Sequence, residues 1–345
     1  MNILLIPVLL MLAACQSSDP GEQQEAAAIR MIAAGKPFPG NATRVTGATD
    51  DQLQNTLLLP GQKIGVYIDN ASDPTSNEYN MGLPIAHAVL QTGYVLQPDG
   101  YEEGTYPEYP NDGAGSVNVY AFYPYSLVSG VQRTGGELPV SVASDQSTAE
   151  SYRSGDVMAA DPVYGHYHSG TTEDIILLSF NHLMSKVTVR LRKIGSFKGD
   201  LSGFTLYFRN SVRQGTLSLE DRAVTVDGTA SPSDITMMTL ATDLGADEER
   251  AASILTVPQV MGSGTFLVLT DGVTTYSAAL PLADATWTYV DTTTWTDPNG
   301  DTGLTLESGY EYLMTATVTD TSLQIDAVIR DFQDGGSYTG RLVSQ

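Results

Sequence analysis

The sequence of 345 residues predicts an all-β protein, and two observations support this prediction. From about Val45 onward, apolar and polar residues alternate over short runs, and clusters of Gly, Asn, Asp or Pro interrupt these runs. Such alternation is typical of half-buried strands, and no long stretch shows the period of an amphipathic helix. Short strands separated in this way favour sandwich-like units.

The chain begins with an apolar run that ends at Ala14 and is too short to span a bilayer, which needs about 20 residues. This length, with small residues at its end, is typical of a secretory signal and its cleavage site. The run closes on four residues that resemble a bacterial lipobox: Leu12, Ala13, Ala14 and Cys15. We therefore expect a lipoprotein signal peptide at residues 1–14.

Cys15 is the only cysteine, so the sequence predicts neither a disulfide nor a cysteine-ligated metal. In a lipobox the cysteine becomes the first residue of the mature protein and carries a lipid. Each buried lipid methylene contributes about 0.8 kcal/mol, and two or more chains anchor stably where one does not. A multiply acylated Cys15 would hold the precursor on a membrane without a transmembrane helix.

Residues 16–40 are small and polar, with Gly, Pro, Gln, Glu and Ala prominent. That composition predicts a flexible tether and not part of a core. Residues 25–34 could form a short helix, but they show no sustained apolar face. We place the lipidated tether, or pro-segment, at residues 15–44.

The strand-like runs continue to the carboxy-terminal region and include "KIGVYI", "SVNVYAFYPY", "KVTVRLR", "TFLVLT", "YLMTATVT" and "LQIDAVI". "SVNVYAFYPY" looks buried on both sides, whereas "KVTVRLR" places valines and a leucine on one face and basic residues and a threonine on the other. A break near residues 169–174 separates a Tyr-rich, acidic half from a regular series of strands. We therefore predict domains at residues 45–175 and 176–345.

Forty acidic and seventeen basic residues give a formal net charge of -23. Such a surface repels phosphate backbones and anionic lipid headgroups, so nucleic acid is not an expected partner. Eight of the basic residues lie between Lys186 and Arg222. This stretch could therefore form a local basic face on an acidic molecule.

His166 and His168 are two residues apart, so a strand would place both on one face, as a metal pair needs. A third ligand would have to come from elsewhere, and the flanking Gly165 and Gly170 favour a solvated turn. His182 has no nucleophile beside it in the sequence and is expected to be a hydrogen-bonded structural residue.

The segment at residues 297–307 partly imitates a calcium loop, but its glycine and last glutamate are displaced, and Asn-Gly favours a hairpin turn. The sequence contains no Gly-rich phosphate loop, no G-x-S-x-G and no H-E-x-x-H. Its carboxylate pairs lie in polar, turn-like runs. We therefore expect no enzymatic activity, no cofactor and no metal.

Ten of the eighteen tyrosines lie between Tyr94 and Tyr167. The stretch "YEEGTYPEYP" places Tyr101, Tyr106 and Tyr109 near carboxylates, where their rings could stack on sugar faces. The alternative is that these rings cover the ends of a sandwich.

The order of the signals becomes specific when the whole chain is considered. A lipobox and a polar tether precede "ATRVTG", "PGQKIGVYI", "VNVYAFYPYS", "SGDVMAADP", "ILLSFNHLMSKVTVRLRK", "LTVPQV" and "LESGYEYLMTATVTDTSLQIDAVI". This series resembles the fimbrillin family, the fimbrial subunit lipoproteins of Bacteroidetes. The resemblance covers nearly the whole chain after Thr43.

The resemblance implies two tandem transthyretin-like Greek-key β-sandwich domains and an outer-membrane lipoprotein precursor that assembles into surface fimbriae. In polymerising members, an arginine-specific protease cuts after the tether and removes the lipid and the first strand. A neighbour's carboxy-terminal strand then fills the vacated groove. Here the family position of the cut corresponds to Arg44, and Arg30 is the competing site.

The candidate donor strand is residues 322–329, in which four apolar residues are expected to share one face: Leu323, Ile325, Ala327 and Ile329. The partners implied are other copies or related subunits, outer-membrane lipid and the protease, with adhesion as the role. The alternative is a non-polymerising surface lipoprotein, or a fimbrial tip or anchor, that binds glycan or host protein through the Tyr-rich loops.

Overall fold

The computed structural model describes residues 28–35, 58, 60–73, 86–91, 95–98, 102–103, 106–110, 113–127, 137–170, 174–193, 197, 201–240, 250–261, 265–279, 287–288, 294–295 and 304–330. Strands account for nearly all regular elements in these residues, which confirms the all-β prediction. The expected signal peptide and most of the segment that imitates a calcium loop lie outside the described residues.

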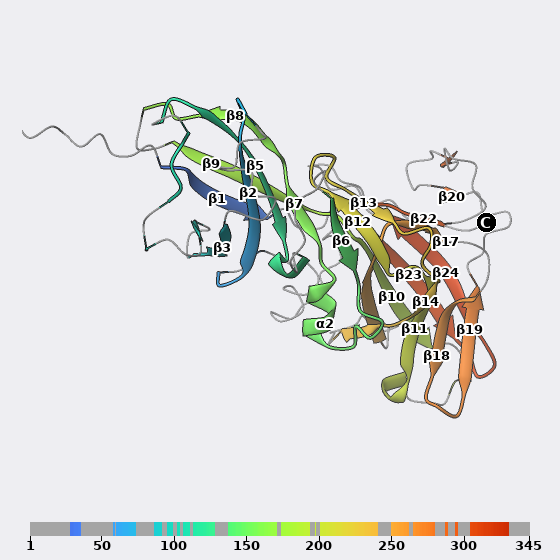
Figure 1. Cartoon of the computed structure of the whole chain (residues 1–345). Helices are drawn as coiled ribbons and strands as arrows, with labels where there is room; N and C mark the ends of the chain where they lie inside the picture. Colours follow the sequence, from blue (N-terminus) through green and yellow to red (C-terminus); the bar gives the residue numbers. More distant parts are fainter. Residues whose placement is uncertain are drawn as a thin grey trace, which may run out of the picture.

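An eight-stranded sheet forms one end of the molecule (Figure 1). Its order is β1-β9-β7-β5-β2-β3-β4, with β8 also paired to β5. The strands are β1 (Arg30–Gly35), β2 (Lys63–Asn70), β3 (Ala86–Leu90), β4 (Leu96–Pro98), β5 (Ser116–Tyr123), β7 (Met158–Ala160), β8 (Val163–Tyr167) and β9 (Ile175–His182). All neighbours in this sheet run antiparallel except β1 and β9, which are parallel.

The two faces of this sheet pack into two different cores. The inner face contributes alternate side chains of β2, β5 and β9 to a first core, which includes Val66, Val119 and Leu178. The outer face sends Tyr67 and Phe122 into a second and larger core, where their rings stack at 5.8 Å. Both faces of the β5 run are thus buried from residue 119 onward, as predicted.

Three further sheets build the other end of the molecule (Figure 1). A five-stranded sheet has β15 (Met238–Leu240), β16 (Arg250–Thr256), β10 (Ser185–Lys193), β23 (Glu311–Val318) and β24 (Leu323–Arg330) in that order. A four-stranded sheet has β14 (Ser233–Thr236), β11 (Thr205–Ser211), β18 (Thr265–Thr270) and β19 (Thr275–Ala279). A three-stranded sheet has β13 (Ala223–Val226), β12 (Gln214–Ser218) and β6 (Glu137–Ser141).

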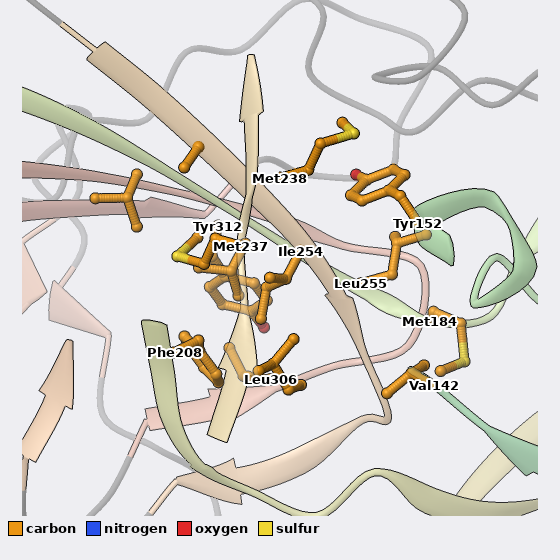
Figure 2. Close-up of a cluster of buried hydrophobic side chains, with 14 of the residues drawn as sticks. Val142, Tyr152, Met184, Phe208, Met237, Met238, Ile254, Leu255, Leu306 and Tyr312 are labelled. Atoms are coloured by element: carbon orange, nitrogen blue, oxygen red, sulfur yellow. The ribbon is translucent and has the colours of Figure 1, made fainter. Parts of the chain in front are cut away.

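Short elements complete this end, and its large core joins the sheets. The remaining described elements are β17 (Gln259–Met261), β20 (Trp287–Thr288), β21 (Thr294–Trp295), β22 (Leu304–Leu306), α2 (Ala149–Ser154) and the 3₁₀ turns η2 (Tyr125–Leu127) and η3 (Leu201–Gly203). Figure 2 shows Phe208, Ile254 and Tyr312 packing together in this core, although they come from three strands. Tyr152 of α2 belongs to the same core (Figure 2).

The chain changes from one end of the molecule to the other between β9 and β10. β9 pairs in the eight-stranded sheet, whereas β10 pairs with β16 and β23. β6 precedes this point in the sequence but pairs with β12, so the two halves of the chain are partly interleaved. The predicted boundary near residue 175 stays a prediction.

The polar face of β10 is more buried than the sequence predicted. Lys186 is only 1% exposed, and its Nζ lies 3.4 Å from Glu311 Oε1 on β23. Thr188 donates a hydrogen bond of 2.9 Å to the same carboxylate oxygen and lies 3.2 Å from Ser253 Oγ. Tyr152 of α2 reaches Ser253 at 3.1 Å, so the helix covers this part of the strand. Alternation along β10 could not reveal that a helix covers its second face.

His182 has the structural role expected from the sequence. Its Nδ1 lies 2.8 Å from Asp156 Oδ1, and both side chains are buried. Burial has the largest effect on Lys186 and lowers its pKa. The negative charges of Glu311 and Asp156 oppose this effect and favour the protonated form.

We predict that Glu311→Gln destabilises the protein by about 3–5 kcal/mol, because it removes the counter-charge that lies 3.4 Å from the buried ammonium of Lys186. The Gln side chain can still accept the hydrogen bond from Thr188. The measured loss of stability therefore reports the removed charge and not a lost hydrogen bond. Adding Lys186→Met should recover most of the lost stability, since a methionine needs no partner there. Urea unfolding of both single variants and the double variant measures the coupling. A double variant as unstable as Glu311→Gln would contradict this explanation.

Candidate functional site

The first described strand completes the eight-stranded sheet. β1 pairs with β9 along its whole length, from Arg30 opposite Ile175 to Gly35 opposite Phe180. On its other side Ile32 bridges Val95, the residue before β4. β1 is therefore one end of the sheet order and also contacts the other end, beside β4, so it brings the two ends together.

The side chains of this segment fill the first core. Ile29, Met31 and Ala33 are buried there, together with Ile176 and Leu178 of β9. The expectation of a flexible tether or a short helix is thus wrong for Arg30–Gly35. The apolar period of two was hidden because alanines and glycines surround it, and because its partner strand lies far along the chain.

The segment at residues 106–110 holds the beginning of β1. The N–H of Ile29 donates a hydrogen bond of 2.6 Å to the carbonyl of Pro107, and Ala28 bridges Glu108. The guanidinium of Arg30 lies 5.8 Å from the centre of the Tyr106 ring, within the range of a cation–π contact. These contacts fix where β1 enters the sheet.

Tyr109 anchors this segment to β8. Its ring is 2% exposed and lies beside the rings of His166 and His168, with centres 6.0 and 5.7 Å away. Its hydroxyl is 2.7 Å from His166 Nδ1. Burial raises the pKa of Tyr109, and the nearby carboxylate of Asp174 raises it further, so the phenol stays protonated.

Asp174 lies between the two histidines of the motif. Its oxygens are 3.5 Å from His166 Nε2 and 3.7 Å from His168 Nδ1. Burial alone would raise the pKa of Asp174, but hydrogen bonds from Ser169 and the charges of both histidines lower it. Within the described parts of the chain, no group of three His, Cys, Asp or Glu side chains could hold a metal ion. The two histidines instead form a polar contact that supports Tyr109.

The tyrosines proposed to contact glycan therefore differ in position. Tyr109 cannot offer its ring face to a sugar because it is buried against the histidines. Tyr106 is half-buried and lies against Arg30. Tyr101 lies outside the described residues, as do Cys15 and the lipobox residues Leu12, Ala13 and Ala14.

The candidate donor strand is part of this chain's own five-stranded sheet. β24 is its edge strand and pairs antiparallel with β23, and Leu323 and Ile325 are buried. The register shifts between Ile325 and Ala327, and beyond the shift Ala327 and Ile329 lie opposite Thr315 and Leu313. This bulge lies within the proposed donor strand, and the shared face of the four residues stays a prediction.

Among the described helices, none is long and apolar enough to cross a membrane. The fold and the site define a class of all-β proteins in which a leading strand completes a sheet built from later segments. The match to a family model is more specific: the fimbrillin-like model covers residues 43–331. The chain therefore belongs to the fimbrillin-like family.

Solved structures share the fold at low sequence identity. A proposed cell adhesion protein from Bacteroides ovatus is 16% identical with a TM-score of 0.62, and the match covers 90% of this chain and 99% of that one. Another from Bacteroides uniformis is 18% identical with a TM-score of 0.56, covering 86% and 95% of the two chains. No curated protein sequence matches this chain.

We predict that Met31→Ala lowers the free energy of unfolding by about 2–5 kcal/mol, because the side chain fills the first core. Ile32→Ala is the matched control, since Ile32 is the next residue of β1 and is only half-buried. It should cost clearly less. Urea denaturation followed by circular dichroism measures both variants, and equal losses would contradict the packing of β1 described above.

Proposed function

We propose that the protein is a structural subunit of cell-surface fimbriae that polymerises by donor-strand exchange after proteolysis. The observation that carries the proposal is β1, whose side chains fill a core built from residues beyond the predicted tether. Removing this strand would expose the edge of β9 and the apolar positions beneath it. An exposed edge with a preformed apolar groove is what an added strand requires.

The cut is proposed at Arg44 and not at Arg30. A cut after Arg30 would leave Met31 and Ala33 attached to the body and still in their places. A cut after Arg44 would detach the whole of β1 from β2, and the family match begins next to this residue, at residue 43. Arg30 is also paired with Ile175 within the sheet. A protease binds its substrate as a separate extended segment, so β1 would first have to leave the sheet.

The energetics agree with exchange being slow but favourable. Ile29 and Met31 each contribute about 1.5–3 kcal/mol through burial, and each main-chain hydrogen bond adds about 1 kcal/mol. While β1 is part of the chain, its pairing with the sheet costs no association entropy. Once the segment is cut free, rebinding it costs at least about 4 kcal/mol in lost translational and rotational freedom. A longer apolar strand from a neighbour can therefore displace it.

The donor is proposed at β24, with Leu323, Ile325, Ala327 and Ile329 as its apolar positions. It would have to leave β23, with which it pairs from Tyr312 to Val318. Its position at the edge of the sheet makes this possible without breaking any other ladder.

The precursor is proposed to be exported as a lipoprotein and held in the outer membrane by acylated Cys15, with its body on the cell surface. Its partners would be other copies or related fimbrial subunits and an arginine-specific protease, and the fimbria would support adhesion. Membership of the fimbrillin-like family supports this location. The alternative of glycan binding through the Tyr-rich segment is less well supported, because Tyr109 is buried.

We predict that cutting the full chain, with Cys15→Ala for solubility, by an arginine-specific protease produces a body that begins at Val45. This body should form ladders on a denaturing gel without boiling. Arg44→Ala should prevent the ladders, whereas Arg30→Ala should not, because only the first change keeps β1 attached. Sequencing of the new amino terminus identifies the cut. A cut body that remains monomeric at high concentration would exclude the mechanism.

A further inference from the structure

Exposed apolar side chains are concentrated on β8 and on β9, the strand that pairs with β1. The described residues include six large apolar side chains that are exposed, and four of them lie on β8 and β9. Their exposed fractions are 61% for Tyr164, 68% for Tyr167, 43% for Ile175 and 58% for Leu177. We call these four residues the outer patch.

The four residues lie on the outer face of the eight-stranded sheet. On β9, Ile176 and Leu178 are buried in the first core, so Ile175 and Leu177 point away from it. On β8, the ring of Tyr164 packs edge-on against Tyr120 at 5.9 Å. Tyr120 belongs to the second core, which lies on the outer face. Tyr167 follows the inward-facing His166.

The outer patch continues a surface that is covered elsewhere. The second core covers the outer face at Tyr67 and Phe122. The turn between β12 and β13 reaches this sheet through an ion pair between Arg222 and Asp161, which lies just before β8. Along β8 and β9 the described residues leave the apolar face open, although a sheet face of this kind is normally buried against another layer.

The outer patch borders the strand that is proposed to be exchanged. Ile175 and Leu177 lie opposite Arg30 and Ile32 of β1. A strand that replaces β1 comes from a second copy, so the body of that copy must approach this edge. Each copy has a formal net charge of -23, and the patch itself contains no charged side chain. It is thus a surface where two acidic molecules can meet with little repulsion.

We propose that the outer patch is the surface against which the body of the donor copy packs once its strand has entered the β1 position. This inference rests on the proposed function. Strand insertion gives the connection between copies, and the patch contact fixes the orientation of each copy on the next.

The test compares polymerisation of protease-cut chains that differ only in exposed residues. Leu177→Asp should slow the appearance of ladders or shorten the filaments seen by electron microscopy by about tenfold or more, as expected for a central interface residue. Val260→Asp is the control, because Val260 is also exposed, lies on β17 and gains the same charge. It should polymerise like the original chain. Thermal unfolding before cutting should be unchanged in both variants.

The outcomes separate the two proposals. Normal ladders and filaments from Leu177→Asp would overturn the patch and leave strand exchange standing. Absence of ladders from the unaltered chain would overturn both. If Leu177→Asp fails to fold, Tyr167→Ser tests the same patch at its most exposed residue, and normal polymerisation of that variant would overturn the patch.

Discussion

The structure depends on β1 closing a sheet that the rest of the chain leaves open. β1 pairs with β9 on one side and bridges the residue before β4 on the other. Ile29, Met31 and Ala33 supply the apolar side chains at this position of the first core. The sheet is therefore built from segments far apart in sequence, and the closing segment is the first strand of the described residues.

The eight-stranded sheet uses its two faces for different purposes. The inner face encloses the first core, whose edge is held by the contact between Tyr109 and His166. The outer face packs against the carboxy-terminal sheets over part of its area. A sheet with one closed core and one partly covered face can lose its closing strand without losing its attachment to the other sheets. This separation makes exchange of β1 physically reasonable.

The sequence predicted the all-β class and the family because alternation and motif order are local signals. The resemblance implied a first strand in the removed segment, but the residue pattern did not locate β1, since parallel pairing with β9 depends on residues far away and its own apolar residues are few. The burial of Lys186 and of Tyr109 depends on side chains from other segments packed over them, which periodicity does not report. The bulge in β24 was invisible for the same reason, because register is set by the partner strand.

The charge distribution explains why assembly through strands suits this molecule. Three of the eight basic residues between Lys186 and Arg222 form ion pairs within the chain: Lys186 with Glu311, which is buried, and Arg209 with Asp234 and Arg222 with Asp161, which are at the surface. Each of these three pairs neutralises a carboxylate of the same chain, so these cations are less available to a second acidic copy. In the proposed assembly, contacts between copies would rest mainly on main-chain hydrogen bonds and apolar burial, which need no opposite charge. An open edge beside β9, flanked by neutral apolar residues, offers both, so the acidic character of the chain favours a strand-mediated contact over an electrostatic one.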